Sequence, residues 1–508
     1  MGCLVLTACQ NAATSTETSS TQQEQSANAT PGPDGAHALN DADTAAAVER
    51  ELYADPSVPA TGIHVKVTEG VVVLTGKVNN LLATSRAPYL AAAVRGVRGI
   101  DNRLDVDVPD VDDASLKNDV VSAMALDPTV EPFDVNIKVH DQVVTLLGTV
   151  KSQQERVWAE RDAKSVVGVR AVENKLKIKY PEPRTDAEIR EDVLGRLHWD
   201  ALLHDGLLVV SVQNGRVNLS GYVGSLGEKL RAEQEAWATG VKAVSSDQLE
   251  VKWWAEDNDL RHGKYVDQTD QEIESAIKEG LSLDPRVSSF TVTPTVDGGV
   301  VTLVGTVTSL RAKRTAKEIA ENTVGVSRVD NLLDVELNGA SDASQQRQAL
   351  SALSLNPLTK SRDIGVEVRS GIATLTGKVQ NAAEKAEAEG VVEGIAGISA
   401  VIDKLAIANP IPFAVEYRGG PYYPNVSSWA AYAASLPLKT DLEMERDIRQ
   451  DLQWSPYVNA KDVHVHVNEG VATLTGKVKT LRARKAAEAN AYQGGAVKTV
   501  DDIEVAAH

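Results

Sequence analysis

The chain has 508 residues, and its 52 Lys and Arg against 71 Asp and Glu leave a net charge of −19. Such an acidic body argues against nucleic-acid binding, which needs a clustered basic surface. The length favours three or four domains. Aromatic residues make up only 4% of the chain, so several small aliphatic cores fit better than one large core. The sequence contains no run of 18 apolar residues and therefore offers no candidate for a bilayer-spanning helix.

The amino terminus has the features of a lipid-anchored, flexible segment. The run Leu6-Thr7-Ala8-Cys9 resembles the lipobox of bacterial lipoproteins, which predicts residues 1–9 to be a truncated signal-like segment with lipid attachment at Cys9. The following Gln resembles an outer-membrane sorting signal. Residues 10–40 are rich in Ser, Thr, Gln and Ala, which is typical of a disordered tether. The apolar stretch before Cys9 is shorter than a signal core, so a chance match and a start upstream of Met1 both stay open.

A short motif, Leu-x-Gly-x-Val, occurs six times and marks an internal repeat with a basic interval of 72 residues, as from Gly76 to Gly148. An alanine follows each glycine after eleven residues, as Ala87 follows Gly76. Each repeat is long enough to be a small domain rather than one unit of a solenoid. The repeated glycines, which we interpret as structural, are Gly76, Gly148, Gly221, Gly305, Gly377 and Gly476.

One repeat contains five predicted elements. An amphipathic helix comes first, as at 270–281 and 441–452, and a strand of strictly alternating apolar residues follows, as at 463–467. The motif strand forms a hairpin with it. A second helix with an Ala stripe and a final strand close the unit. The fold class is therefore α+β: tandem small α-β-β-α-β domains, each a three-stranded sheet with two helices on one face.

We interpret the repeated Gly and Ala as partners in one close contact. A Gly in the motif strand leaves room where the second helix crosses, and the Ala lets that helix approach. Two repeats depart from the pattern: the third is off by one residue around Ser245 and Ser246, and the sixth is one residue short around Asp501 and Asp502. Pro294 interrupts the first strand of the fourth repeat and is expected at a sheet edge or a bulge.

The element order and two motifs resemble the BON domain (bacterial OsmY and nodulation). Besides the hairpin motif, the sequence Gly-Val-x-x-Val-x-Asn-x-Leu stands at 168–176 and 325–333. The resemblance divides the chain into six BON domains with a linker insert at 253–266 and an aromatic-rich insert at 410–438. The six domains are 41–108, 112–179, 185–252, 267–337, 342–407 and 439–506.

The resemblance implies an envelope protein, often periplasmic and osmotically induced, that attaches to phospholipid and performs no catalysis. We predict no enzyme activity, no cofactor and no metal site, and we expect His464 and His466 on the solvent face of their strand. The predicted function is a non-enzymatic binding or scaffold protein that associates with phospholipid membranes under osmotic or envelope stress. The alternative is a periplasmic scaffold for protein or peptidoglycan, or a chaperone-like stress factor, without direct lipid affinity. The predicted location is the periplasm, with an N-terminal lipid in the outer membrane.

Cations on two second helices are the candidate membrane contacts, because they avoid the Ala stripe and are expected to face out. Exposed cations near anionic lipid each contribute about 1 kcal/mol. The alternative is an ordinary charged helix face. The insert at 410–438 could clamp two domains, bind a protein or glycan, or enter a membrane interface. The candidate contacts are Arg311, Lys313, Arg314, Lys317, Arg482, Arg484 and Lys485.

Overall fold

The computed structural model describes residues 40–505, apart from a few internal gaps. The predicted lipid site at Cys9, the tether up to residue 39 and the aromatic-rich insert at 410–438 lie outside the described residues. The internal gaps are 56, 128–134, 181, 257–267, 288–290, 338, 361, 381, 408–438, 456 and 497.

Each repeat begins with a helix whose start is fixed by a polar cap. In repeat 4, Thr269 accepts from the backbone N–H of Glu272, and the Glu272 side chain accepts in return from the Thr269 backbone. This capping box satisfies two amide groups that have no partner inside the helix. Ile273, Ile277 and Leu281 then recur every four residues and are buried on one side of the helix.

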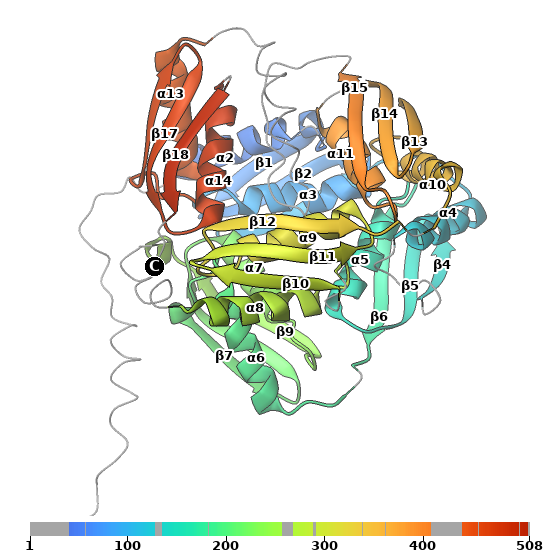
Figure 1. Ribbon diagram of the computed structural model, residues 1–508, viewed down its shortest axis with the longest axis horizontal. Helices are drawn as coiled ribbons and strands as arrows, with labels where there is room; N and C mark the ends of the chain where they lie inside the picture. The colour runs from blue at the N-terminus through green and yellow to red at the C-terminus, as the bar shows by residue number, and fades with distance from the viewer. Residues whose placement is uncertain are drawn as a thin grey trace, which may run out of the picture. The chain divides into compact units, whose positions relative to one another are not determined.

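The elements follow the same order in the first three repeats (Figure 1). Repeat 1 contains α2 (Asp41–Ala54), β1 (Ile63–Thr68), β2 (Val71–Val78), α3 (Leu81–Ala92) and β3 (Gly99–Val106). Repeat 2 contains α4 (Asp113–Leu126), β4 (Val135–His140), β5 (Val143–Val150), α5 (Gln153–Lys164) and β6 (Ala171–Ile178). Repeat 3 contains α6 (Asp186–Trp199), β7 (Leu208–Gln213), β8 (Arg216–Val223), α7 (Leu226–Glu235) and β9 (Ala243–Val251).

The last three repeats keep this order. Repeat 4 contains α8 (Asp270–Leu283), β10 (Val292–Asp297), β11 (Val300–Val307), α9 (Leu310–Glu321) and β12 (Arg328–Val335). Repeat 5 contains α10 (Asp342–Leu355), β13 (Asp363–Arg369), β14 (Ile372–Val379), α11 (Ala382–Glu393) and β15 (Ala400–Ile407). Repeat 6 contains α13 (Asp441–Trp454), β16 (Val463–Asn468), β17 (Val471–Val478), α14 (Leu481–Gln493) and β18 (Lys498–Val505). Short 3₁₀ turns stand at Ala60–Gly62, Asp205–Leu207 and Trp253–Glu256.

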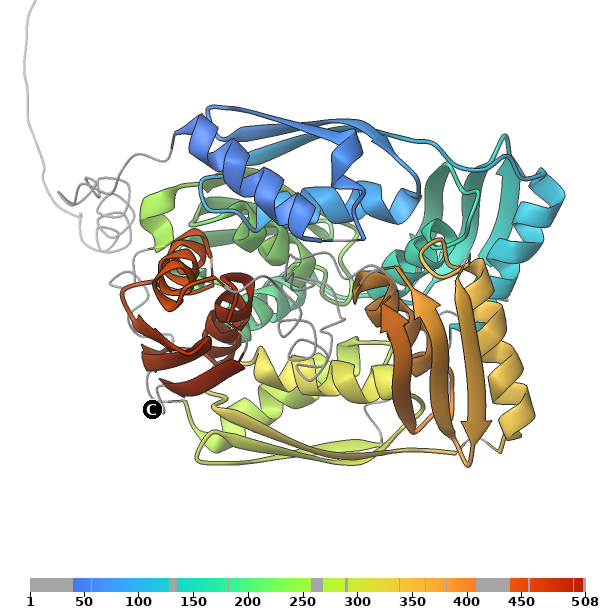
Figure 2. The ribbon, with the colours of Figure 1, turned by 90° about the horizontal axis from the view of Figure 1, so that it is seen from above.

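The sheet of each repeat is mixed, with the motif strand in the centre. In repeat 5, β14 pairs antiparallel with β13 and parallel with β15. The two helices of this repeat, α10 and α11, contact each other and the sheet, and Figure 2 shows α10 packed alongside the three strands. The same strand order occurs in all six sheets of the described chain. The predicted α-β-β-α-β fold is therefore confirmed.

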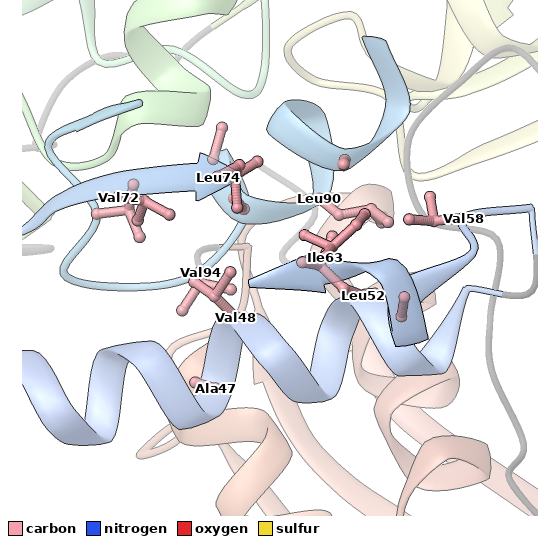
Figure 3. Packing of buried hydrophobic residues seen from close by; sticks show 14 of the residues in the cluster. Ala47, Val48, Leu52, Val58, Ile63, Val72, Leu74, Leu90 and Val94 are labelled. Carbon is pink, nitrogen blue, oxygen red and sulfur yellow. The ribbon is translucent and has the colours of Figure 1, made fainter. Parts of the chain in front are cut away.

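The core of a repeat lies between the helices and the inner face of the sheet. In repeat 1, Val48 and Leu52 of α2 pack with Val72 and Leu74 of β2 and with Leu90 of α3 (Figure 3). All five side chains are at most 1% exposed. The six repeated alanines are completely buried, as the pattern predicts: Ala87, Ala159, Ala232, Ala316, Ala388 and Ala487.

The role that we assigned to the repeated glycines needs correction. Gly377 has a φ of +115°, in the region that favours glycine. A Cβ there would overlap the carbonyl oxygen of Asp363, at the start of the neighbouring strand. At Gly76, Gly221, Gly305 and Gly476 a Cβ would overlap the carbonyl oxygen of the residue directly before the first strand of the hairpin. The glycine is required by close approach of two strands and a positive φ, rather than by the crossing of the second helix.

The irregular repeats are explained by the strand registers. In repeat 3 the pairing of β8 with β9 shifts between Asn218 and Ser220, so the extra residue forms a bulge. In repeat 6 the pairing of β17 with β18 is regular from Lys498 onward, so the missing residue falls before β18 rather than at Asp501. Pro294 lies on β10, an edge strand of its sheet, as expected.

Candidate functional site: the second helices and the contacts between repeats

An aspartate at the first residue of each first helix holds the hairpin turn. Asp342 accepts hydrogen bonds from the backbone N–H of Ser370 at 2.9 Å and of Gly371 at 3.2 Å. The sequence analysis missed these residues, although an Asp stands 35 positions before every repeated glycine. Their shared contact indicates a structural role. The six clamps are Asp41, Asp113, Asp186, Asp270, Asp342 and Asp441.

In repeats 1, 2, 4, 5 and 6 the second helix is joined to the last strand at one shared position, in two chemically different ways. In repeat 1, the Asn102 side chain donates to the backbone carbonyl of Thr84 at 2.8 Å, and repeats 2 and 4 have the same bond. Repeat 6 has Asp501 at the Asn position, and this Asp pairs with Arg484 at 2.8 Å. Repeat 5 has the equivalent pair between Lys385 and Asp403 at 3.4 Å. The candidate Arg484 is thus engaged inside its own repeat.

The two arginines of α9 bind other repeats. Arg311 lies 3.0 Å from Asp127 of repeat 2 and donates to the carbonyl of Gly390 in repeat 5 at 3.1 Å. Its side chain is only 15% exposed. Arg314 pairs with Glu393 of repeat 5. The expectation that these arginines face out is therefore wrong, because each turns toward an acidic residue of another repeat.

Two of the remaining candidates meet at Glu321, the last residue of α9. Lys485 of repeat 6 lies 2.6 Å from Glu321, and Lys317 lies 3.7 Å from the same carboxylate. Both lysine side chains are 43% exposed. Arg482 places its guanidinium 5.1 Å from the centre of the Tyr457 ring, within the range of a cation–π contact. Lys313 is partly exposed, and its backbone carbonyl accepts from Asn331.

Two carboxylic acids on these helices have altered acidity. Burial raises the pKa of Glu318 on α9 to about 7, and the charge of Glu321 adds to this effect; Arg286, Arg314 and Arg482 oppose it. Burial also raises the pKa of Asp162 on α5 well above its usual range, with a further contribution from Asp127 and opposition from Arg311 and Arg161. Both acids therefore hold a proton at higher pH than an exposed carboxyl group.

Backbone hydrogen bonds join the repeats at equivalent positions. The donor is a backbone N–H that stands 19 positions after the repeated glycine of its own repeat. The acceptor is a backbone carbonyl in another repeat, 22 positions before the repeated glycine of that repeat. Val324 donates to Trp199 at 2.9 Å, Val167 to Leu355 at 3.1 Å and Arg95 to Trp454 at 3.4 Å. These bonds join repeat 4 to 3, repeat 2 to 5 and repeat 1 to 6.

A leucine five positions after the repeated glycine adds an apolar contact between repeats. Leu81 packs in the core of repeat 2, Leu226 in that of repeat 1, and Leu310 against that of repeat 5. This leucine is visible in the sequence as a repeated position in four of the six repeats. Repeats 2 and 5 have Gln153 and Ala382 there instead. The second helices thus supply apolar and ionic contacts to other repeats, and the segments that follow them supply backbone hydrogen bonds.

The described residues contain no group of three or more His, Cys, Asp or Glu side chains placed to hold a metal ion. His464 and His466 lie on the exposed face of β16, as expected. Over the same part of the chain, no helix combines the length and apolar character needed to cross a membrane.

Comparison with known proteins assigns these repeats to one family of small domains. The BON domain model matches residues 40–107, 112–180, 185–252, 269–336, 341–409 and 440–507. The chain therefore belongs to the BON domain family and carries six tandem copies. It is 31% identical over 150 residues to the osmotically-inducible protein Y of Escherichia coli K12. The aligned region covers 28% of this chain and 74% of that protein.

Solved structures give a weaker likeness. CdsD, a structural protein of the type III secretion system of Chlamydia trachomatis, is 17% identical to this chain. The match has a TM-score of 0.12 and covers 40% of this chain and 90% of the other. The C-terminal domain of CdsD is 18% identical, with the same TM-score, over 42% of this chain and all of the other. These TM-scores are too low to carry an argument.

Proposed function

We propose that this chain is a non-enzymatic scaffold of the bacterial periplasm that acts under osmotic or envelope stress. The observation that carries the proposal is the use of two second-helix cations inside the molecule, where Arg311 and Arg314 bind acids of other repeats. Charges engaged in this way are not offered to a lipid surface. The link to osmotic stress rests on the name of the Escherichia coli relative, and the periplasmic location on the family resemblance.

The scaffold offers a peptidoglycan or protein partner several similar domains in one body. Several weak contacts on linked domains reinforce one another through effective concentration. The lipid site at Cys9, followed by a tether, would hold this body at the outer membrane.

Phospholipid association is the second candidate function. It is favoured by Lys317 and Lys485, whose side chains remain 43% exposed although they lie beside Glu321. Two such lysines contribute about 2 kcal/mol to binding an anionic surface at low salt, and the net charge of −19 opposes that contribution.

Flotation of the full, unlipidated chain with phosphatidylglycerol vesicles separates the two functions. The scaffold proposal predicts that the protein stays unbound at both low and high salt, and that it sediments with purified peptidoglycan or with an envelope partner. Lys317→Glu with Lys485→Glu is the informative variant, and Lys278→Glu is its control, because Lys278 is also an exposed helix lysine paired with a Glu. Flotation at low salt that the double variant abolishes and the control retains would favour the lipid function.

A further inference from the structure

Asp162 of α5 is an acid with an unusual position. Its side chain is 9% exposed, and its Oδ2 atom has no hydrogen-bond partner within the described residues. Three charged groups act on it: Asp127 from the end of α4, Arg161 from α5 itself, and Arg311 from α9 of repeat 4. A buried carboxylate oxygen without a donor is costly when charged.

The guanidinium that faces Asp162 is already bound. Arg311 pairs with Asp127 at 3.0 Å and also donates to the carbonyl of Gly390. Arg161 lies over the Trp158 ring, with 4.6 Å between the guanidinium carbon and the ring centre. Arg311 therefore pairs with one carboxyl group, Asp127, and acts on a second, Asp162, through its charge.

A second contact closes the same junction between repeats 2 and 4. Arg286 of repeat 4 lies 4.9 Å from the centre of the Trp158 ring, and Asp284 holds this arginine at 2.5 Å. When Asp162 is protonated, the pair of Asp127 and Arg311 is neutral. When Asp162 ionises, a second negative charge is buried beside Asp127, and like charges at close range repel.

We propose that the junction between repeats 2 and 4 is a pH-sensitive latch, tight while Asp162 is protonated and loosened when Asp162 is ionised. The groups that set this response are Asp127, Arg161 and Arg311, together with the pair of Arg286 and Asp284 against Trp158. The latch concerns the joining of domains and is independent of what the surface of the protein binds.

The direction of the response follows from proton binding. The folded protein binds a proton at Asp162 more tightly than the unfolded chain does, because burial raises the pKa of this acid. The proton on Asp162 makes its full contribution to the stability of the folded protein below the ordinary pKa of Asp. That contribution is lost as the pH rises through the raised pKa of Asp162. Alkaline conditions therefore loosen the junction.

Hydrogen exchange of the full chain at pH 6 and pH 9, corrected for the intrinsic exchange rate, tests the latch. We expect protection of the α5 and α9 amides to fall by about tenfold per pH unit until the pH passes the raised pKa of Asp162. The variant Asp162→Asn should lose clearly less protection at the α5 amides between pH 6 and pH 9 than the unchanged protein, although Glu318 of α9 still ionises in this range. The control Asp110→Asn, at an exposed site, should behave as the unchanged protein. Equal protection at the two pH values in the unchanged protein would overturn the proposal, as would the same loss in Asp162→Asn.

A second variant covers the case in which Asp162→Asn does not fold. Asp127→Asn removes the negative charge beside Asp162, so the positive charge of Arg311 is no longer neutralised by Asp127 and acts on Asp162 alone. The midpoint of the pH response should then move to lower pH. An unchanged midpoint would contradict the role of Arg311.

Discussion

Arg484 on α14 pairs with Asp501 on β18 at 2.8 Å, at the two positions where repeats 1, 2 and 4 use an asparagine and a backbone carbonyl. The residue on the last strand therefore sets the kind of bond, because repeats 2 and 4 have Arg156 and Lys313 at the helix position and still use their backbone carbonyls. An Asp on the strand instead pairs with the charged side chain of the helix residue, in repeat 5 as well as in repeat 6. A charge that looks like a surface feature in the sequence is part of the internal bonding of one domain.

Removing the arginine of this pair should be harmful only while the aspartate remains. Arg484→Ala is expected to lower the free energy of unfolding by up to about 1 kcal/mol, because the pair is partly exposed. Adding Asp501→Asn should restore stability, since Asn can donate to the helix carbonyl as Asn102 does. Urea unfolding of the two variants checks this. A double variant as unstable as Arg484→Ala would show that the two positions are independent.

Gly377→Ala should destabilise the protein by at least about 2 kcal/mol, because it adds backbone strain and an overlap with the Asp363 carbonyl. Gly339→Ala is the matched control. Gly339 also has a positive φ, of 71°, but no atom lies within 4 Å of an added Cβ, so only about 1 kcal/mol should be lost. Urea unfolding free energies measure both effects. Equal losses would mean that the approach of the strands is not what requires glycine.

The clamp of the hairpin turn should be visible at single amides. Asp342→Ala removes the acceptor of the N–H groups of Ser370 and Gly371 and should cost about 1–3 kcal/mol. Hydrogen exchange at these two amides should accelerate, whereas Asp110→Ala should leave them unchanged. Unaltered exchange in Asp342→Ala would show that the turn holds its shape without the clamp.

Leu226→Ala tests whether one repeat stabilises another. Leu226 belongs to repeat 3 but packs in the core of repeat 1, so its loss should cost about 2–4 kcal/mol. The control is Leu230→Ala on the same helix, where the leucine is 40% exposed. Hydrogen-exchange protection in repeat 1 should fall for Leu226→Ala alone. A loss of protection confined to repeat 3 would contradict the interdomain role.

Stability should depend on pH through Glu318. Its pKa of about 7 lies above the ordinary Glu value of 4.5, so the stabilising effect of its proton is complete below pH 4.5 and disappears as pH rises through 7. Glu318→Gln should match the unchanged protein near pH 4.5 and be more stable at pH 8, whereas the exposed control Glu250→Gln should show no such gain. Urea midpoints at the two pH values decide this, and parallel pH profiles for Glu318→Gln and the unchanged protein would exclude the effect.

The sequence predicts the fold of one repeat well because each element carries its own signal. Alternating residues in β16 and the buried apolar spacing in α8 specify strand and helix directly. The clamp aspartates were also readable, since all six stand at one distance from the repeated glycine. The role of that glycine could not be read in the same way, because its φ depends on how closely the first strand of the hairpin approaches.

The candidate site was harder to predict. Arg311 and Arg314 avoid the core of their own repeat, and a pattern within one domain cannot distinguish a solvent-facing cation from one bound to another domain. Their partners Asp127 and Glu393 lie 184 and 79 residues away in sequence. Such pairings depend on the packing of complete domains and leave no periodic trace.

The central claim is that cations of the second helices join the repeats, and a double-mutant cycle on Arg314 and Glu393 tests it most directly. Unfolding free energies would be measured for Arg314→Ala, Glu393→Ala and the double variant. We predict a coupling energy within the range of about 0.5–3 kcal/mol that is typical of residues in contact. Strictly additive losses would contradict the claim, because they would mean that these two residues, in different BON domains, do not interact.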